Sequence, residues 1–166
     1  DLQSKGSDNL LQNGGGGGNT AGDPDQNNGS GGGSGNTGQK VDPCLTPNLE
    51  QFVYQTSNYE ESALKEQAIG IASESQFRAI STDVKALTAH FKLCADITLT
   101  MPHNPIGLAF NQPYKGQFDF NRKTISNLKI ALNNGVLPDY SGLFSKTDGA
   151  NLHDLTLANI LVNAGS

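Results

Sequence analysis

The chain has 166 residues, a formal net charge of −5 and no tryptophan. It contains no basic patch or stripe of lysine and arginine, which argues against nucleic acid as a partner. No run of about 18 apolar residues occurs, so the sequence predicts no transmembrane segment.

Residues 1–40 differ in composition from the rest of the chain. They hold thirteen of the twenty glycines and no aromatic residue. Such a segment cannot bury enough apolar surface to offset the entropy lost on ordering, so we expect a flexible tether rich in Gly, Asn and Ser. A low-complexity tail without a role is the alternative. Apolar residues become regular from Val41, and residues 41–166 suit a single small domain.

The first half of residues 41–166 has the pattern of helices. Three helix starts occur there, one N-cap followed by proline and two pairs with capping-box spacing: Thr46–Pro47, Ser57 with Glu60, and Ser73 with Gln76. After the third start, apolar residues recur at helical spacing at Phe77, Ile80, Val84, Leu87 and Phe91. This rhythm predicts one amphipathic helix whose apolar stripe faces the core. Gly70 is expected to mark a break between this helix and the preceding one.

The second half of the domain has the pattern of strands. Apolar and polar residues alternate from Phe91 to Met101, which predicts a half-buried strand with Cys94 on its less apolar face. Further on, the segments KGQFDF and NLKIAL predict a hairpin closed around NRKT. The stretch from Ala150 to Ser166 fits a helix or a strand, and a strand is slightly favoured. Helices followed by strands predict an α+β domain, in which N-terminal amphipathic helices pack on a small antiparallel β-sheet.

The two cysteines, Cys44 and Cys94, predict a disulfide in an oxidising compartment. Two buried free thiols in a cytosolic protein are the alternative. A bridge would close a loop of about 50 residues and stabilise the domain by about 4 kcal/mol in the chain-entropy model. Because the sequence begins with Asp1, we expect either a processed protein from which any signal peptide has been removed or a cut piece of a longer one. Low charge and abundant Asn, Gly, Ser and Thr, together with the missing initial methionine, favour an extracytoplasmic location.

The sequence contains few signals of a catalytic, cofactor or metal site. No metalloprotease, nucleophile-elbow, Walker or dinucleotide motif occurs, so the sequence predicts no catalytic residue, no cofactor and no metal. Four alternatives stay open: a calcium loop around Asp23, Asp25 and Asn27, a zinc site of His90, Cys94 and Cys44, a Ser/His/Asp site, and a carboxylate pair of Asp119 and Asp139. The calcium loop lacks its bidentate glutamate, because Ser34 stands in that place.

Two loops are the candidates for contact with a partner. The segments FNQPYKG and LPDYSGLF combine proline, tyrosine and glycine with amide or carboxylate groups. They supply the possible contact residues Asn111, Tyr114, Asp139 and Tyr140, because tyrosine offers a rigid contact surface at low entropy cost. The alternative is that both tyrosines pack at the rim of the core.

Taken together, these features predict a non-enzymatic structural or protein-interaction component of a cell-envelope or extracellular assembly. Its partners would be other proteins of that assembly, including copies of itself, bound through sheet edges. The alternative is a module that binds a surface polymer such as cell wall or carbohydrate, or a small hydrolase. That function requires a cleft where two ionisable groups converge, drawn from His90, His103, Asp119, Asp139, His153 and Asp154.

Overall fold

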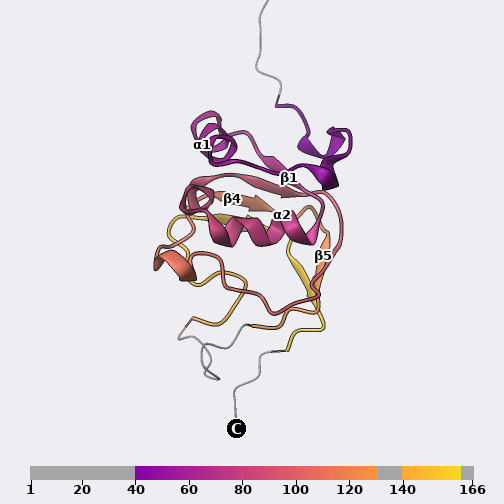
Figure 1. Cartoon of the computed structure of the whole chain (residues 1–166), viewed down its shortest axis with the longest axis vertical. Helices are drawn as coiled ribbons and strands as arrows, with labels where there is room; N and C mark the ends of the chain where they lie inside the picture. Colours follow the sequence, from indigo (N-terminus) through magenta and orange to yellow (C-terminus); the bar gives the residue numbers. More distant parts are fainter. Residues whose placement is uncertain (1–39, 131–139, 162–166) are drawn as a thin grey trace, which may run out of the picture. The chain divides into compact units, whose positions relative to one another are not determined.

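The computed structural model describes residues 40–130 and 140–161. The predicted tether therefore lies outside the described residues, apart from Lys40, and the calcium alternative lies outside them entirely. The described part forms two β-sheets and two α-helices, which are joined by short 3-10 helices and turns (Figure 1).

Both sheets are built from short parallel strands. The larger sheet has the order β1 (Ile69–Ile71), β2 (Phe91–Leu93), β4 (Gln117–Asp119) and β6 (Asn151–His153). The smaller sheet has the order β3 (Ile97–Thr98), β5 (Thr124–Ser126) and β7 (Thr156–Ala158). Every strand pair in them is parallel.

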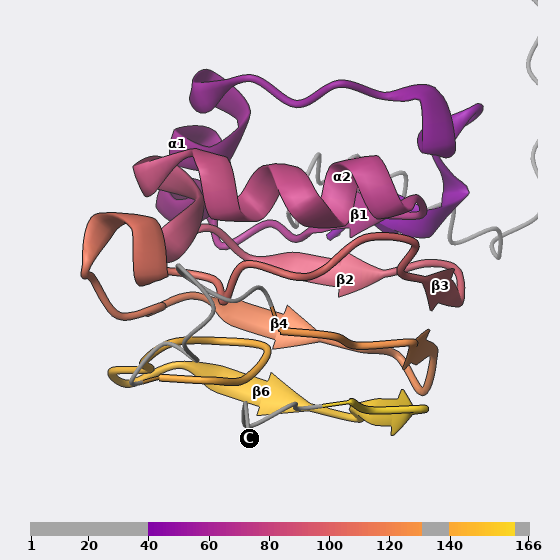
Figure 2. The ribbon, with the colours of Figure 1, turned by 60° about the horizontal axis from the view of Figure 1, so that its bottom comes forward.

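The chain winds as a solenoid. β2 leads into β3, β4 into β5 and β6 into β7, so each of these turns adds one strand to both sheets. Figure 2 shows β2, β4 and β6 stacked one on another, with the helices at the β1 end of the stack. This is the architecture of a parallel β-helix, in which each coil contacts only its neighbours.

The prediction of an antiparallel sheet is wrong. The expected hairpin of KGQFDF and NLKIAL does not form among the described residues, because Lys129 and Ile130 of the second segment make parallel bridges to Leu161 and His103. After β4 the chain instead turns a corner into β5, which lies in the other sheet. Asn121 and Arg122 make this corner with left-handed backbone angles, at φ 51° and 56°. β4 then pairs with the next coil, where Phe118 lies opposite Leu152. The favoured strand in the C-terminal stretch is confirmed by β6 and β7, although both pair in parallel.

The helices are shorter than the sequence predicts. The capping box at the start of α2 (Glu74–Ala79) is confirmed, because Gln76 N donates to Ser73 Oγ and Ser73 N donates to Gln76 Oε1. The single long helix predicted there is wrong beyond α2. Asp83 is extended, with φ −130°, and its carboxylate accepts from Lys85 N at 2.9 Å. The chain therefore continues as two 3-10 helices, η3 (Ile80–Thr82) and η4 (Val84–Thr88).

The other two predicted helix starts are also wrong. Thr46 follows the 3-10 helix η1 (Pro43–Leu45) instead of opening a helix, and a second 3-10 turn, η2 (Leu49–Gln51), comes after it. The helix α1 (Thr56–Lys65) begins before Ser57, where Asn58 Oδ1 accepts from Gln55 N at 2.8 Å. A last 3-10 turn, η5 (Leu108–Phe110), lies between β3 and β4.

The core is a stack of apolar side chains that face the inside of the coils. Phe91 and Phe118 are paired in neighbouring strands, and their ring centroids lie 5.5 Å apart. Phe118 also stacks on Phe120 at 4.3 Å and meets the edge of Phe77 from α2 at 6.3 Å. All four rings are 1% exposed or less, so aromatic contacts join the coils to each other and to α2.

One end of the stack is closed by residues 40–65, which we call the N-terminal cap. A disulfide joins Cys44 in the cap to Cys94 after β2, which confirms the predicted bridge. The Tyr54 hydroxyl donates to the Gly70 carbonyl of β1 at 2.7 Å. A Cβ atom on Gly70 would meet Pro43 O at 2.9 Å and Cys94 Sγ at 3.1 Å, so cap and β1 are in tight contact.

A buried histidine makes the stability of this core depend on pH. His103 is 1% exposed, stacks on Phe77 at a centroid distance of 5.5 Å, and lies 2.9 Å from Leu143 O through its Nε2. Burial lowers the pKa of His103, and the positive charge of Arg78 lowers it further, against a raising contribution from the Leu143 carbonyl. The folded protein therefore holds this imidazole neutral, with its Nε2–H donating to Leu143.

We expect the free energy of unfolding, measured by urea titration, to fall as the pH is lowered from about 7.5 to about 5. The fall should be up to about 1.4 kcal/mol per pH unit for each histidine involved. The unfolded chain binds the proton at the ordinary pKa of histidine, whereas the folded chain binds it only at lower pH, so acid favours unfolding. The variant His103→Gln, which keeps an N–H donor near the Nε2 position, should show a smaller fall. Burial also lowers the pKa of His90, so His90→Gln should reduce the remainder. An equal fall in His103→Gln and the parent would contradict the prediction.

Candidate functional site

The structure brings the two predicted contact loops together but places one of their tyrosines in the core. Tyr114 is fully buried, and its hydroxyl lies 2.9 Å from Ala89 O and 2.8 Å from Gln117 O. Burial raises the pKa of Tyr114. Its ring therefore offers no surface to a partner.

Two other members of this set, Asn111 and Tyr140, contact one lysine. Lys146 Nζ donates to Asn111 Oδ1 at 3.0 Å and lies 4.5 Å from the ring centroid of Tyr140, which is 46% exposed. Asp139 lies outside the described residues. A contact role for Asn111 and Tyr140 stays a prediction.

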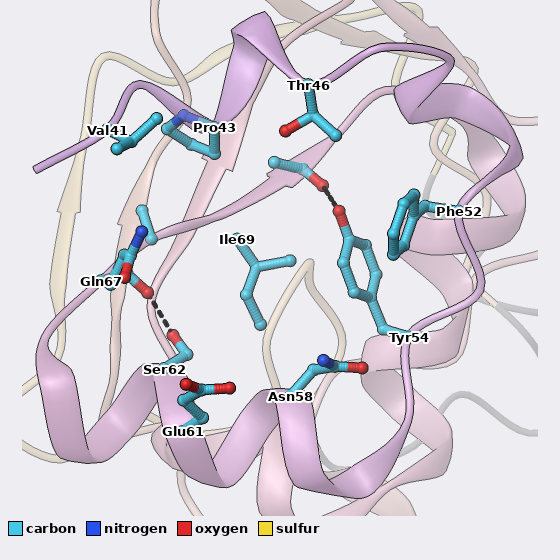
Figure 3. Close-up of a pocket in the computed structure, with 12 residues that line it drawn as sticks. Val41, Pro43, Thr46, Phe52, Tyr54, Asn58, Glu61, Ser62, Gln67 and Ile69 are labelled. Atoms are coloured by element: carbon cyan, nitrogen blue, oxygen red, sulfur yellow. Dashed lines mark hydrogen bonds between the residues drawn. The ribbon is translucent and has the colours of Figure 1, made fainter. Parts of the chain in front are cut away.

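A hollow of about 280 Å³ lies in the N-terminal cap (Figure 3). Two of its polar side chains are bonded within the chain: Tyr54 donates to Gly70 O, and Ser62 Oγ donates to Gln67 O at 2.6 Å. Its rim carries exposed apolar groups, of which Phe52 is 49% exposed. This hollow offers apolar contact area, and the one carboxylate in its lining, Glu61, is paired with Lys65.

A second hollow lies where the polar outer face of the larger sheet meets residues 40–43 and 66–68. Strand register places Lys92, Asp119 and His153 in one row across β2, β4 and β6. These three side chains, with His90 and Gln117, line a hollow of about 320 Å³. Lys92, Asp119 and His153 come from three successive coils, so the row exists only because the coils stack in register.

His90 is held neutral at one side of this hollow. Its Nδ1 accepts a hydrogen bond from Gln117 N at 3.1 Å, which leaves Nε2 as the protonated nitrogen. Burial lowers the pKa of His90, and the nearby Glu66 only partly opposes this effect. The zinc site suggested by His90 and Cys94 has no free thiol, because Cys94 is bonded to Cys44.

Asp119 and His153 line the other side of the hollow, and Asp154 lies beside His153. His153 Nδ1 lies 3.5 Å from Asp119 Oδ1 and 3.1 Å from Asp154 Oδ2. The candidate ligand atoms of these three residues all lie within 4.8 Å of one another. Two carboxylates beside one imidazole can hold a cation or accept hydrogen bonds from a polyol. Of the other ionisable groups named from the sequence, His103 lies in the core and Asp139 lies outside the described residues.

A short internal repeat in the sequence indicates the stacking that brings Asp119 and His153 together. Thr124–Asn127 reads TISN and Thr156–Asn159 reads TLAN, and the two segments pair residue by residue as β5 and β7. Both asparagines are left-handed, at φ 60° and 53°, and end their strands at the same corner. This internal repeat predicts stacked coils, and stacked coils place Asp119 beside His153.

No family model, curated protein or solved structure matches this chain. Within residues 40–130 and 140–161, no helix has both the length and the apolar character needed to cross a bilayer. The function is therefore argued from the chain's own side chains.

Proposed function

We propose that this chain is a non-enzymatic structural or protein-interaction component of an extracytoplasmic assembly, such as a cell envelope. The main support is the distribution of exposed apolar side chains. Five of them lie in the N-terminal cap: Val41, Leu45, Phe52, Val53 and Leu64. Four more lie on the last coil: Leu152, Leu155, Ile160 and Leu161. Apolar groups gathered at two ends of a molecule are typical of surfaces that other proteins cover.

The location is supported by the Cys44–Cys94 disulfide. Such bonds persist in oxidising compartments and are rare in the cytosol. The composition of residues 1–40 supports the second part of the proposal, a flexible tether between the solenoid and an anchor or another module.

Site-specific photo-crosslinking in cells that make the protein tests this function. A photo-reactive amino acid replaces Val53 in the cap or Leu155 on the last coil, which are 77% and 41% exposed. We expect discrete cross-linked products from at least one of the two positions and none from the same group at Asp148, an exposed residue paired with Lys115. A chain that gives no product at any position, and that is monomeric by light scattering when purified from the envelope, would contradict the proposal.

A second candidate function is binding of a surface carbohydrate, and one observation favours it. The hollow on the outer face of the larger sheet contains the converging Asp119 and His153, with Asp154 beside them. This is the concave site with converging ionisable groups that such a function requires. Carboxylates and amides in a shallow groove bind sugar hydroxyls, with or without a bridging divalent cation.

Titration with soluble cell-wall fragments, with and without calcium, tests this candidate by calorimetry. Asp119→Asn should weaken binding by about tenfold or more, because it removes a charged acceptor worth about 1.5–3 kcal/mol. Asp148→Asn changes the charge equally at an exposed ion pair away from the hollow and should leave binding unchanged. Equal loss in the two variants would assign the effect to net charge and remove the hollow as a binding site.

A further inference from the structure

A small polar hollow of about 100 Å³ lies between the segment formed by α2 and η3 and the loop that follows β3. Its lining residues are Arg78, Ser81, Thr82, His103 and Asn104. None of them lines either of the two hollows described above. Space of this size holds a few water molecules or a small polar group. We call it the His103 hollow.

A ring nitrogen of a buried histidine opens into this hollow. His103 is 1% exposed, and its Nε2 bonds Leu143 O at 2.9 Å. Within residues 40–130 and 140–161 its Nδ1 makes no hydrogen bond, whereas every side-chain nitrogen or oxygen sealed from solvent there has a partner. Nδ1 is therefore the accessible atom of the ring, and the hollow is where it is reached. Because Nε2 carries the proton for the Leu143 carbonyl, Nδ1 presents a lone pair.

The two hydroxyl groups of the hollow also present lone pairs. Ser81 Oγ donates its proton to Asn104 O at 3.1 Å. Thr82 Oγ1 donates its proton to Ala79 O at 2.8 Å. Since both protons are used within the chain, the hydroxyl oxygens remain as acceptors.

Arg78 supplies the donors and the charge of the hollow. Its Nη1 and Nη2 donate to Met101 O at 3.3 Å and Pro102 O at 3.0 Å, which leaves further N–H groups of the guanidinium for a ligand. The positive charge of Arg78 contributes to the lowered pKa of His103, and it would likewise repel a cation. A carboxylate or sulfate, which only accepts hydrogen bonds, would face the lone pairs of the ring and the hydroxyls. The lining therefore fits a neutral group that both donates and accepts.

We propose that the His103 hollow binds a vicinal diol of a sugar. One hydroxyl of the diol donates to His103 Nδ1, and a hydroxyl oxygen accepts from Arg78. A buried nitrogen without a partner is costly, and the diol removes that cost. The proposal goes beyond the proposed interaction function and does not rest on it. It is also independent of sugar binding at Asp119 and His153, which line a different hollow.

Nuclear magnetic resonance of the ¹⁵N-labelled full chain tests this site, through long-range proton–nitrogen spectra of its three histidines. The probes are D-glucose, D-mannose and D-galactose. With at least one of them at up to about 50 mM, we expect a saturable change in the His103 Nδ1 shift and a Kd of about 1–10 mM. His90 Nδ1, which already accepts from Gln117 N, should not change. Cyclohexanol, a ring of the same size with one hydroxyl, should leave all three histidines unchanged.

Two variants locate the bound sugar, with the backbone amide shifts of residues 78–82 as the readout. His103→Gln keeps an N–H donor for Leu143 O but removes Nδ1, so the Kd should rise by about fivefold or more. His90→Gln is its control and should leave the Kd unchanged.

Ser81→Leu fills the hollow and should abolish binding. The same change at Ser75, an exposed residue of α2, should leave binding unchanged. Circular dichroism melts establish that the variants fold.

Three results would overturn the inference: no saturable change at His103 Nδ1 with any of the three sugars, an equal change with cyclohexanol, or tighter binding of sulfate or acetate than of the sugars. The last result would identify an anion site. Binding that survives His103→Gln and Ser81→Leu but is lost in Asp119→Asn would place the sugar in the hollow of the larger sheet and also overturn it. Absence of photo-crosslinks would reject the proposed interaction function and leave this inference standing, because neither Val53 nor Leu155 lines the His103 hollow.

Discussion

Removing the disulfide with the double change Cys44→Ser and Cys94→Ser is expected to lower the unfolding free energy by about 4 kcal/mol. The two cysteines are 50 residues apart, so the bond removes much of the freedom of the unfolded chain. For a domain of this size the melting temperature should fall by about 15 °C. Calorimetry of parent and variant measures both quantities.

Reduction supplies the matching control for this prediction. Dithiothreitol should lower the melting temperature of the parent to that of the double variant and should not affect the double variant itself. The loss should be largest in the cap, because Gly70 packs directly against Cys94 Sγ and Pro43 O. Equal melting temperatures for oxidised parent and double variant would show that cap packing alone holds this end closed.

Phe118→Ala is expected to destabilise the protein by about 3–5 kcal/mol, the usual cost of deleting a buried aromatic ring. Phe118 is fully buried and contacts Phe91, Phe120 and Phe144 with centroid distances of 5.5, 4.3 and 6.3 Å. The substitution removes a ring from the centre of the stack and leaves a cavity between two coils. Urea unfolding followed by circular dichroism gives the difference in free energy.

Leu152→Ala is the matched variant, because Leu152 occupies the same column one coil later. Its side chain is 37% exposed, so truncation should cost only about 1 kcal/mol. A loss of unfolding free energy for Leu152→Ala as large as for Phe118→Ala would mean that the Leu152 side chain is already covered in solution. The difference between the two variants therefore measures how far burial falls from the centre of the stack to its last coil.

The sequence predicts the core better than the fold. Phe91, Leu93, Ile97 and Leu99 are buried, as the alternation from Phe91 predicts, but Met101 at its end is 55% exposed. The predicted single strand is two strands, however, because the chain turns a corner between Leu93 and Ile97 into the other sheet. The alternation of buried and exposed side chains resumes in phase at Ile97 after the corner, so a period of two in the sequence does not reveal the corner.

The same limit explains the incorrect helix. Phe77, Ile80, Leu87 and Phe91 are buried, as the helical rhythm predicts, whereas Val84 of the same stripe is 37% exposed. The rhythm continues past Asp83 although the helix does not, because the carboxylate of Asp83 bonds the backbone of Lys85 and favours an extended residue there. A side chain can reach the core from a 3-10 turn at nearly the same spacing as from an α-helix.

The disulfide was predictable because only two cysteines exist, whereas the site on the outer face of the larger sheet was not. Asp119 and His153 lie far apart in the sequence and meet only through the parallel register of β4 and β6. An antiparallel hairpin would place neither beside the other. Coil register, which the repeated Thr–apolar–small–Asn segment indicates, is the information needed to predict their contact.

The difference between the two ends gives the protein a preferred direction of mechanical failure. Under tension applied at the last coil, β6 and β7 would separate from β4 and β5 first, because each ladder has at most three paired residues and can open one coil at a time. Rupture would then progress toward β1 and stop where the covalent bond between Cys44 and Cys94 joins the first segment to the end of β2. A stretched molecule would thus lengthen in steps from one side while its cross-linked side stays attached.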